Sequence, residues 1–254
     1  MRLIALLAIL SACGHGAAVE PLILGTQAFP PFHDARDGTP VGPGVEIVTA
    51  AADRAGLACE VRLLPWRRAQ EMARDGRIHG LFLIGRNPER EGWLSFTAPI
   101  LTTEYGLFTR SDADWTYRDV EDLRGRTVAV YGPSNTASSL ATIAGELDGA
   151  IDIDLRPDDD VGFRKLAAAR VDAVYSNKSV GLALIRRLEL SGLVYAGTHR
   201  PVRYYAALAT EHVAGDRVAA FQEGMQAIIA DGTVAAIIAR HGLEDEVRVG
   251  AADE

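Results

Sequence analysis

The stretch Asn87-Pro88-Glu89-Arg90, followed by Ser95-Phe96-Thr97-Ala98-Pro99-Ile100, decides how this chain is interpreted. It comes just after a short apolar strand, Gly80-Leu81-Phe82-Leu83-Ile84, and Asn-Pro opens a loop at that point. Open α/β sheets bind ligands at strand ends, and an arginine fork grips a carboxylate with two parallel hydrogen bonds. The motif therefore predicts a carboxylate site at Arg90. Taken alone, it more often describes a surface arginine paired with a neighbouring glutamate, so the rest of the chain has to decide.

The chain begins with the features of a secretory signal peptide: a charged start, the apolar run Leu3 to Leu10, and then small residues. The run is too short to span a bilayer. Two cleavage points remain open. Cleavage after Ala18 makes residues 1–18 the signal peptide, whereas cleavage after residue 12 leaves a lipidated Cys13. Both predict export to the periplasm.

Length and composition leave room for two ordinary globular domains or one large one after the signal peptide. The formal net charge of −8 argues against nucleic acid as a partner. With Cys13 removed or lipidated, Cys59 is alone, so we expect no intramolecular disulfide and a small buried hydrophobe at Cys59. The histidines are scattered without ligand spacing, and we expect no metal and no cofactor.

Hydrophobic periodicity predicts alternating strands and helices. Strands are expected over residues 22–26, 59–64, 81–84, 105–109, 127–131, 151–155, 171–175, 193–196 and 205–210. Helices are expected over residues 45–55, 69–74, 137–147, 157–169, 180–188, 216–230 and 234–240. The aspartates at 158–160 fit a helix start, where the dipole favours acids, better than a metal site. The alternation predicts an α/β fold of doubly wound sheets with helices on both faces.

Two candidate boundaries divide the chain, a polar stretch at 110–114 and a second stretch at 197–203. They suggest one α/β unit inserted into another, with residues 19–109 and 201–254 in lobe 1 and residues 110–200 in lobe 2. Two strands would then cross between the lobes. This arrangement places a cleft between the lobes and permits hinge closure.

Several motifs in order resemble the bacterial solute-binding proteins of family 3, the periplasmic receptors of polar amino-acid ABC transporters. They are Phe29-Pro30-Pro31-Phe32, Gly44 to Val48, Gly76-Arg77-Ile78, Asn87 to Arg90, Phe96 to Pro99, Asp122 to Val130 and Val171 to Val174. The resemblance covers nearly the whole mature chain and implies the two-lobed type II periplasmic-binding-protein fold. It also implies a small carboxylate ligand, an inner-membrane ABC permease as partner, a monomer, and no cofactor.

The resemblance implies a role for three residues of the first lobe. Arg90 matches the arginine that binds the ligand's carboxylate, Phe29 an aromatic that packs against the ligand, and Trp66 an aromatic on the opposite wall. Independently of the family, Phe-Pro-Pro-Phe is a stiff turn that presents aromatic faces, and tryptophan is amphipathic enough to line a wet cleft. We expect Phe32, by contrast, to fill the core of the lobe.

Gly132-Pro133-Ser134-Asn135-Thr136 links a strand to a helix N-terminus in the second unit. Such an end offers unpaired amides and a positive dipole, which suit an anion. The resemblance implies that this loop, through Ser134, Asn135 and Thr136, helps to hold the carboxylate bound by Arg90. One of these side chains can also cap the helix, and both roles are compatible.

Two positions depart from the family pattern. Asn177 stands where the family usually has an acid that pairs with the ligand's α-ammonium, and an amide supplies no negative charge. Gly85 stands where a hydroxyl is common, which leaves only backbone donors. We therefore hypothesise an anionic ligand whose α-amino group is absent or held by neutral acceptors.

Enzyme motifs are mostly missing, and we expect a binding protein. Gly42-Pro43-Gly44 lacks the strand and the third glycine of a dinucleotide loop, and no Gly-x-Ser-x-Gly elbow occurs. One enzyme alternative is a periplasmic lyase of the cyclohexadienyl dehydratase type, which needs a carboxylate in the cleft; Glu104 and Asp172 are the candidates. A ligand-sensing receptor of a signalling system is a third class.

Overall fold

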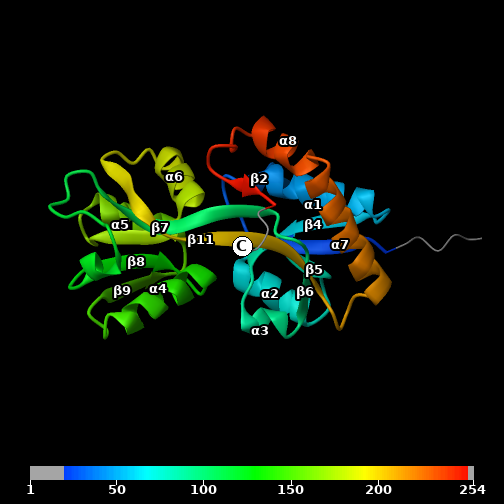
Figure 1. The fold of residues 1–254 in the computed structure, drawn as a ribbon, viewed down its shortest axis with the longest axis horizontal. Helices are drawn as coiled ribbons and strands as arrows, with labels where there is room; N and C mark the ends of the chain where they lie inside the picture. The colour runs from blue at the N-terminus through cyan, green and yellow to red at the C-terminus, as the bar shows by residue number, and fades with distance from the viewer. Residues whose placement is uncertain (1–19, 251–254) are drawn as a thin grey trace, which may run out of the picture.

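A computed structural model describes residues 20–250, as two α/β halves joined by two long strands (Figure 1). The predicted signal peptide, with both cleavage points and Cys13, lies outside the described residues. No helix in the described range is long and apolar enough to cross a membrane.

The first half is built on three parallel strands. β1 (Leu22–Thr26) lies between β4 (Cys59–Leu63) and β5 (Gly80–Gly85). β5 is buried along its whole length, as its unbroken apolar sequence predicts. The helices of this half are α1 (Pro43–Arg54), α2 (Trp66–Arg74), the short α3 (Pro88–Glu91), α7 (Gly215–Ala230) and α8 (Thr233–Arg240). Four short strands complete it: β2 (Asp34–Arg36), β3 (Thr39–Val41), β6 (Leu94–Phe96) and β12 (Arg248–Val249).

The second half repeats this plan. β8 (Thr127–Tyr131) lies in parallel between β9 (Asp152–Arg156) and β10 (Ala173–Asn177). Its helices are α4 (Asn135–Glu146), α5 (Asp159–Ala167) and α6 (Lys178–Arg187), preceded by a short 3₁₀ helix over Val120–Leu123. Each α helix starts just after a strand, at the edge of the sheet where parallel strands end.

The two halves share two antiparallel strands that run from one to the other, β7 (Leu101–Arg110) and β11 (Leu193–Ala209). β11 pairs with β5 and β7 pairs with β10, so one sheet runs in the order β4-β1-β5-β11-β7-β10-β8-β9. The prediction of two separate strands at 193–196 and 205–210 is wrong, because β11 is continuous over 17 residues. Register shifts at Tyr195/Gly197 and Thr198/Arg200 allow β11 to bend. The glycine and proline in this stretch are residues that usually end a strand, which is why the sequence predicted a boundary here.

Apolar side chains from both halves fill the core. Phe32 is fully buried, as predicted, whereas Cys59 is half-buried and packs against the core. Cys59 forms no disulfide within the described chain, and burial raises the pKa of its thiol to about 11.

Helix α7 approaches α1 so closely that only glycine fits at Gly224. A Cβ there would lie 2.3 Å from the backbone oxygen of Ala51. We predict that Gly224→Ala lowers the free energy of unfolding by about 1–3 kcal/mol through overpacking. In urea unfolding, Gly145→Ala is the matched control: Gly145 is exposed on α4 with no neighbour within 4 Å, so alanine should stabilise by about 0.5–1 kcal/mol. A neutral or stabilising Gly224→Ala would contradict this packing.

Candidate functional site

A cavity of about 570 Å³, including its open mouth, lies where the two halves face each other. Elements of both halves and the two crossing strands contribute to its wall. The structure brings all of the predicted site residues to this wall: Phe29, Trp66, Gly85, Arg90, Ser134, Asn135, Thr136 and Asn177. Clefts between two lobes are common sites for small-molecule ligands.

Arg90 owes its position to a capped turn. The Asn87 side chain accepts a hydrogen bond from the Arg90 backbone N–H at 2.9 Å, and Pro88 occupies the first helical position of α3. The arginine side chain then turns inward, and the residue is only 7% exposed. The Asn87-Pro88-Glu89-Arg90 motif is therefore a helix start that directs one guanidinium into the cavity.

The contacts of this guanidinium are all neutral. Nη1 donates to the backbone oxygen of Gly85 at 2.7 Å and Nη2 to Oε1 of Gln70 at 3.3 Å. The guanidinium carbon lies 5.5 Å from the centre of the Trp66 ring. These contacts use only part of the N–H donors of arginine, so the remaining donors are available to a ligand.

The surface-arginine alternative is wrong. Glu89 pairs with Arg74 and Glu91 pairs with Arg86, so neither glutamate reaches Arg90. Within the described residues no carboxylate forms an ion pair with Arg90. Burial lowers the pKa of Arg90, but a guanidinium stays protonated in proteins. The cavity therefore contains a buried cation for which the described residues supply no paired counter-charge.

Aromatic rings form the apolar part of the wall. Phe29 is half-buried, stacks on Phe32 with ring centres 5.5 Å apart, and meets Tyr204 edge-on at the same distance. Trp66 is half-buried at the first residue of α2, beside Arg90. Both predicted aromatics therefore present a ring to the cavity while another part of the ring packs on the protein.

The loop before α4 faces the cavity from the second half. Ser134 caps α4. Its Oγ accepts a hydrogen bond from the Ala137 N–H at 3.0 Å and donates one to the backbone oxygen of Tyr131 at 2.6 Å. The capping prediction is thus confirmed for Ser134, whose hydroxyl is already engaged. The first amides of α4 have no partner within the helix, so Asn135 and Thr136 retain donors beside the cavity.

Two hydrogen bonds join the halves across the cavity. Asn87 Nδ2 donates to Asn135 Oδ1 at 2.9 Å, and the Tyr131 hydroxyl donates to Gln27 Oε1 at 2.8 Å. A Cβ at Gly85 would lie 2.5 Å from Asn135 Nδ2, so this close approach requires glycine. Sequence reasoning missed Gln27 and Tyr131, which belong to no motif.

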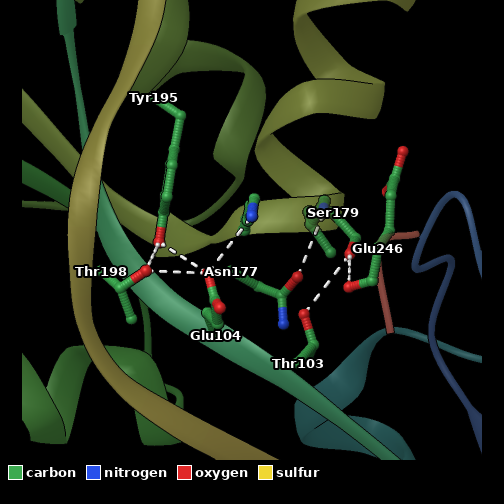
Figure 2. Close-up of polar contacts among 9 residues, drawn as sticks. Thr103, Glu104, Asn177, Ser179, Tyr195, Thr198 and Glu246 are labelled. Carbon is green, nitrogen blue, oxygen red and sulfur yellow. Dashed lines mark hydrogen bonds and ion pairs between the residues drawn. The ribbon is translucent and has the colours of Figure 1, made fainter. Parts of the chain in front are cut away.

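Asn177 is 3% exposed and caps α6. Its Oδ1 accepts from the Val180 N–H at 3.2 Å, and its Nδ2 lies 3.4 Å from the Tyr204 hydroxyl. Asn177 pairs with Tyr105 on the crossing strand β7, and Figure 2 shows its side chain beside this strand. Because the oxygen is occupied by the cap, Asn177 presents a neutral donor side to the cavity.

The two acids considered for a lyase are not at the cavity wall. Glu104 Oε2 accepts a hydrogen bond from the Thr198 hydroxyl at 2.8 Å and one from the Tyr195 hydroxyl at 3.4 Å. The same oxygen forms an ion pair with Lys178 Nζ at 3.4 Å (Figure 2). Asp172 is exposed and accepts from the Thr127 N–H at 2.7 Å. Both acids therefore support the local structure.

A different acid, Asp159, lines the cavity, and sequence reasoning missed it. The prediction that the aspartates start a helix is confirmed, since Asp158 caps α5 by accepting from the Val161 N–H at 2.9 Å. Asp159 follows as the first residue of α5 and is half-buried. Desolvation first, and then the charges of Asp160 and Asp158, raise its pKa to about 7. No group of three or more potential metal ligands occurs in the described residues.

The sequence is similar to a known protein family and to a known protein. The sequence model of the family 'bacterial extracellular solute-binding proteins, family 3' matches residues 22–244. A probable amino-acid-binding protein of Bacillus subtilis strain 168, YxeM, is 27% identical over 194 residues, which is 73% of this chain and 72% of that protein.

Solved structures agree on the architecture. A histidine kinase sensor domain with similarity to periplasmic binding proteins has a TM-score of 0.77 at 28% identity, covering 87% of this chain and 94% of its own. The arginine-, lysine-, histidine-binding protein ArtJ of Geobacillus stearothermophilus has a TM-score of 0.74 at 19% identity, covering 87% and 94%. At that identity ArtJ shows the fold alone. The predicted two-lobed type II periplasmic-binding-protein fold is confirmed.

The environment of Asp159 predicts a pH-dependent change in stability. A carboxyl whose pKa is higher in the folded than in the unfolded chain favours folding at low pH, and this contribution is lost as pH rises through about 7. Asp159→Asn should therefore raise the melting temperature of the ligand-free protein at pH 8 and change it little at pH 4. A lower melting temperature at pH 8 would show that the ionised carboxylate is stabilised.

Proposed function

We propose, since the chain belongs to the bacterial extracellular solute-binding proteins, family 3, that it captures a small carboxylate-bearing ligand in the cavity between its lobes. The ligand is an amino acid or a related organic anion. The observation that carries this proposal is Arg90, a buried guanidinium at the cavity wall without an acidic partner in the described chain. A buried charge is costly unless it is paired, and a ligand carboxylate supplies the pair.

The wall residues divide the work of binding in this account. Arg90 fixes the carboxylate with its free donors, together with backbone amides of Gly85 and the start of α4. Phe29 and Trp66 flank the body of the ligand. Asn177 contributes a neutral donor from the far side. Binding is completed by closure of the lobes.

The hinge for closure is the pair of crossing strands, and the closing contacts are the Asn87–Asn135 and Tyr131–Gln27 hydrogen bonds. Asn87 also caps the turn that carries Arg90. The same residue therefore supports the ligand-binding arginine and makes a contact that closes the lobes. The lobes extend over residues 19–109 with 201–254 and over 110–200. The closed monomer then delivers its ligand in the periplasm to an inner-membrane ABC permease.

A sensing role is the second candidate, and one comparison favours it. The sensor domain of a histidine kinase shares the architecture at 28% identity. In that role the closed form is read by a signalling partner instead of a permease. Ligand capture at Arg90 is common to both roles.

A lyase is the third candidate, because Asp159 places a carboxyl with a pKa of about 7 at the cavity wall. Such a group suits general acid–base work near neutral pH. Incubation of the protein with prephenate and each bound compound, followed by proton NMR, separates the roles. We expect unchanged compounds; conversion that disappears in Asp159→Asn would establish the lyase.

Arg90 is expected to decide binding. We predict that amino acids, dicarboxylates or keto acids that raise the melting temperature of the mature protein bind about a hundredfold more weakly to Arg90→Ala in calorimetry. Arg90→Lys should recover only part of this loss, since lysine cannot form the two-pronged contact.

The matched control is Arg67→Ala, because Arg67 is an exposed arginine on α2 that pairs with Glu71. It should bind like the parent protein. If no carboxylate raises the melting temperature, or if Arg90→Ala binds the carboxylate as tightly as the parent protein does, the proposed function is wrong.

A further inference from the structure

The cavity wall carries a second charge without a partner, the carboxylate of Asp159. Among the described residues, no group donates a hydrogen bond to it and no cation forms an ion pair with it. Arg187 is the cation that acts on it, but its guanidinium is bonded to Asp160. Desolvation without compensation is unfavourable for an ionised carboxylate.

The two unpaired charges belong to opposite lobes and to different parts of the wall. Arg90, on α3, lies against Gly85, Gln70 and Trp66. Asp159, on α5, also lines the adjoining hollow with Gln27, Phe29 and Tyr131. No ion pair joins Arg90 to Asp159. A small molecule with opposite charges at two points can therefore meet both.

Asn177 does not supply the negative charge. Its oxygen is engaged by the Val180 N–H, and its nitrogen is directed to the Tyr204 hydroxyl. Glu104 and Asp172 are held away from the wall by their own partners. Of the described acids, Asp159 is the one that lines the cavity with Arg90.

We propose that Asp159 is the specificity-determining residue of the cavity and pairs with a cationic amino or guanidino group of the carboxylate ligand. The inference rests on the proposed function at Arg90 and narrows its ligand class. It replaces the sequence-based hypothesis of an amino group that is absent or held by neutral acceptors. Dicarboxylates and keto acids are excluded as preferred ligands, since they would face Asp159 with a second negative or neutral group.

Protonation of Asp159 then regulates affinity. The titratable and charged groups that face it are Asp158 and Asp160 on its own turn, Arg187 from α6, Tyr131 from β8 and Tyr204 from β11. Burial raises the pKa of both tyrosines, so they stay neutral near pH 7. A ligand cation favours the ionised carboxylate of Asp159. Because the pKa of Asp159 is about 7, ligand binding at a pH below 7 must release a proton from Asp159.

The test is calorimetric titration of the mature protein with amino acids and, for each, the carboxylic acid of the same carbon skeleton without its amino or guanidino groups, the des-amino acid. At pH 8 we expect the amino acid that binds best to bind roughly tenfold to a hundredfold more tightly than its des-amino acid. Asp159→Asn should remove this preference. Asp158→Asn is the matched control, since asparagine also caps helices, and should keep it.

The pH profile gives a second readout. From pH 8 to pH 6 the affinity of the parent protein for that amino acid should fall about tenfold, and Asp159→Asn should show no such fall. If des-amino acids bind equally well, or Asp159→Asn keeps the preference, this inference is overturned while loss of binding in Arg90→Ala still supports the proposed function. If no carboxylate binds at all, both are overturned.

Discussion

The proposed binding of a ligand depends on one interaction that the described residues leave incomplete, the charge of Arg90 inside the cavity. The turn capped by Asn87, the backbone oxygen of Gly85 and the ring of Trp66 hold the guanidinium in place without neutralising it. Taking a cation out of water is costly, and neutral oxygens recover only part of that cost. In the proposed function, an anion that enters the cavity recovers the rest of that cost. The position of Arg90 just after β5 therefore contributes to the free energy of ligand binding.

In the proposed function, lobe closure and ligand binding are coupled through the same small set of contacts. Asn87 caps the turn of Arg90 and donates to Asn135 on the other lobe, and the crossing strands β7 and β11 are the proposed hinge. Glu104 on β7 accepts from Thr198 on β11, and Ser179 at the start of α6 lies 3.4 Å from Thr103 on β7 (Figure 2). These bonds brace the second lobe against the hinge, so we infer that movement is concentrated in the bends of β11.

Much of the fold could be predicted from the sequence, because period and turn chemistry are local. The alternation of strands and helices, the burial of Phe32 and the capping of α4 by Ser134 all follow from short stretches. The continuity of β11 did not, since its bends occur where glycine and proline imitate a boundary. At the site, motif residues were found and Asp159 was not: a first-turn aspartate is explained by the helix dipole, and only the facing of the lobes gives it a second role.

We propose that Arg90 serves a ligand anion and not the fold, and replacement of Arg90 by an apolar side chain of similar length tests this proposal. Arg90→Met removes the buried charge, and such replacements are often neutral or stabilising. The free energy of unfolding of the ligand-free protein, measured in urea beside carboxylate binding, decides the matter. We expect an unchanged or higher free energy of unfolding, with carboxylate binding lost. A stability loss of more than about 2 kcal/mol with binding retained would contradict it and make Arg90 a structural residue.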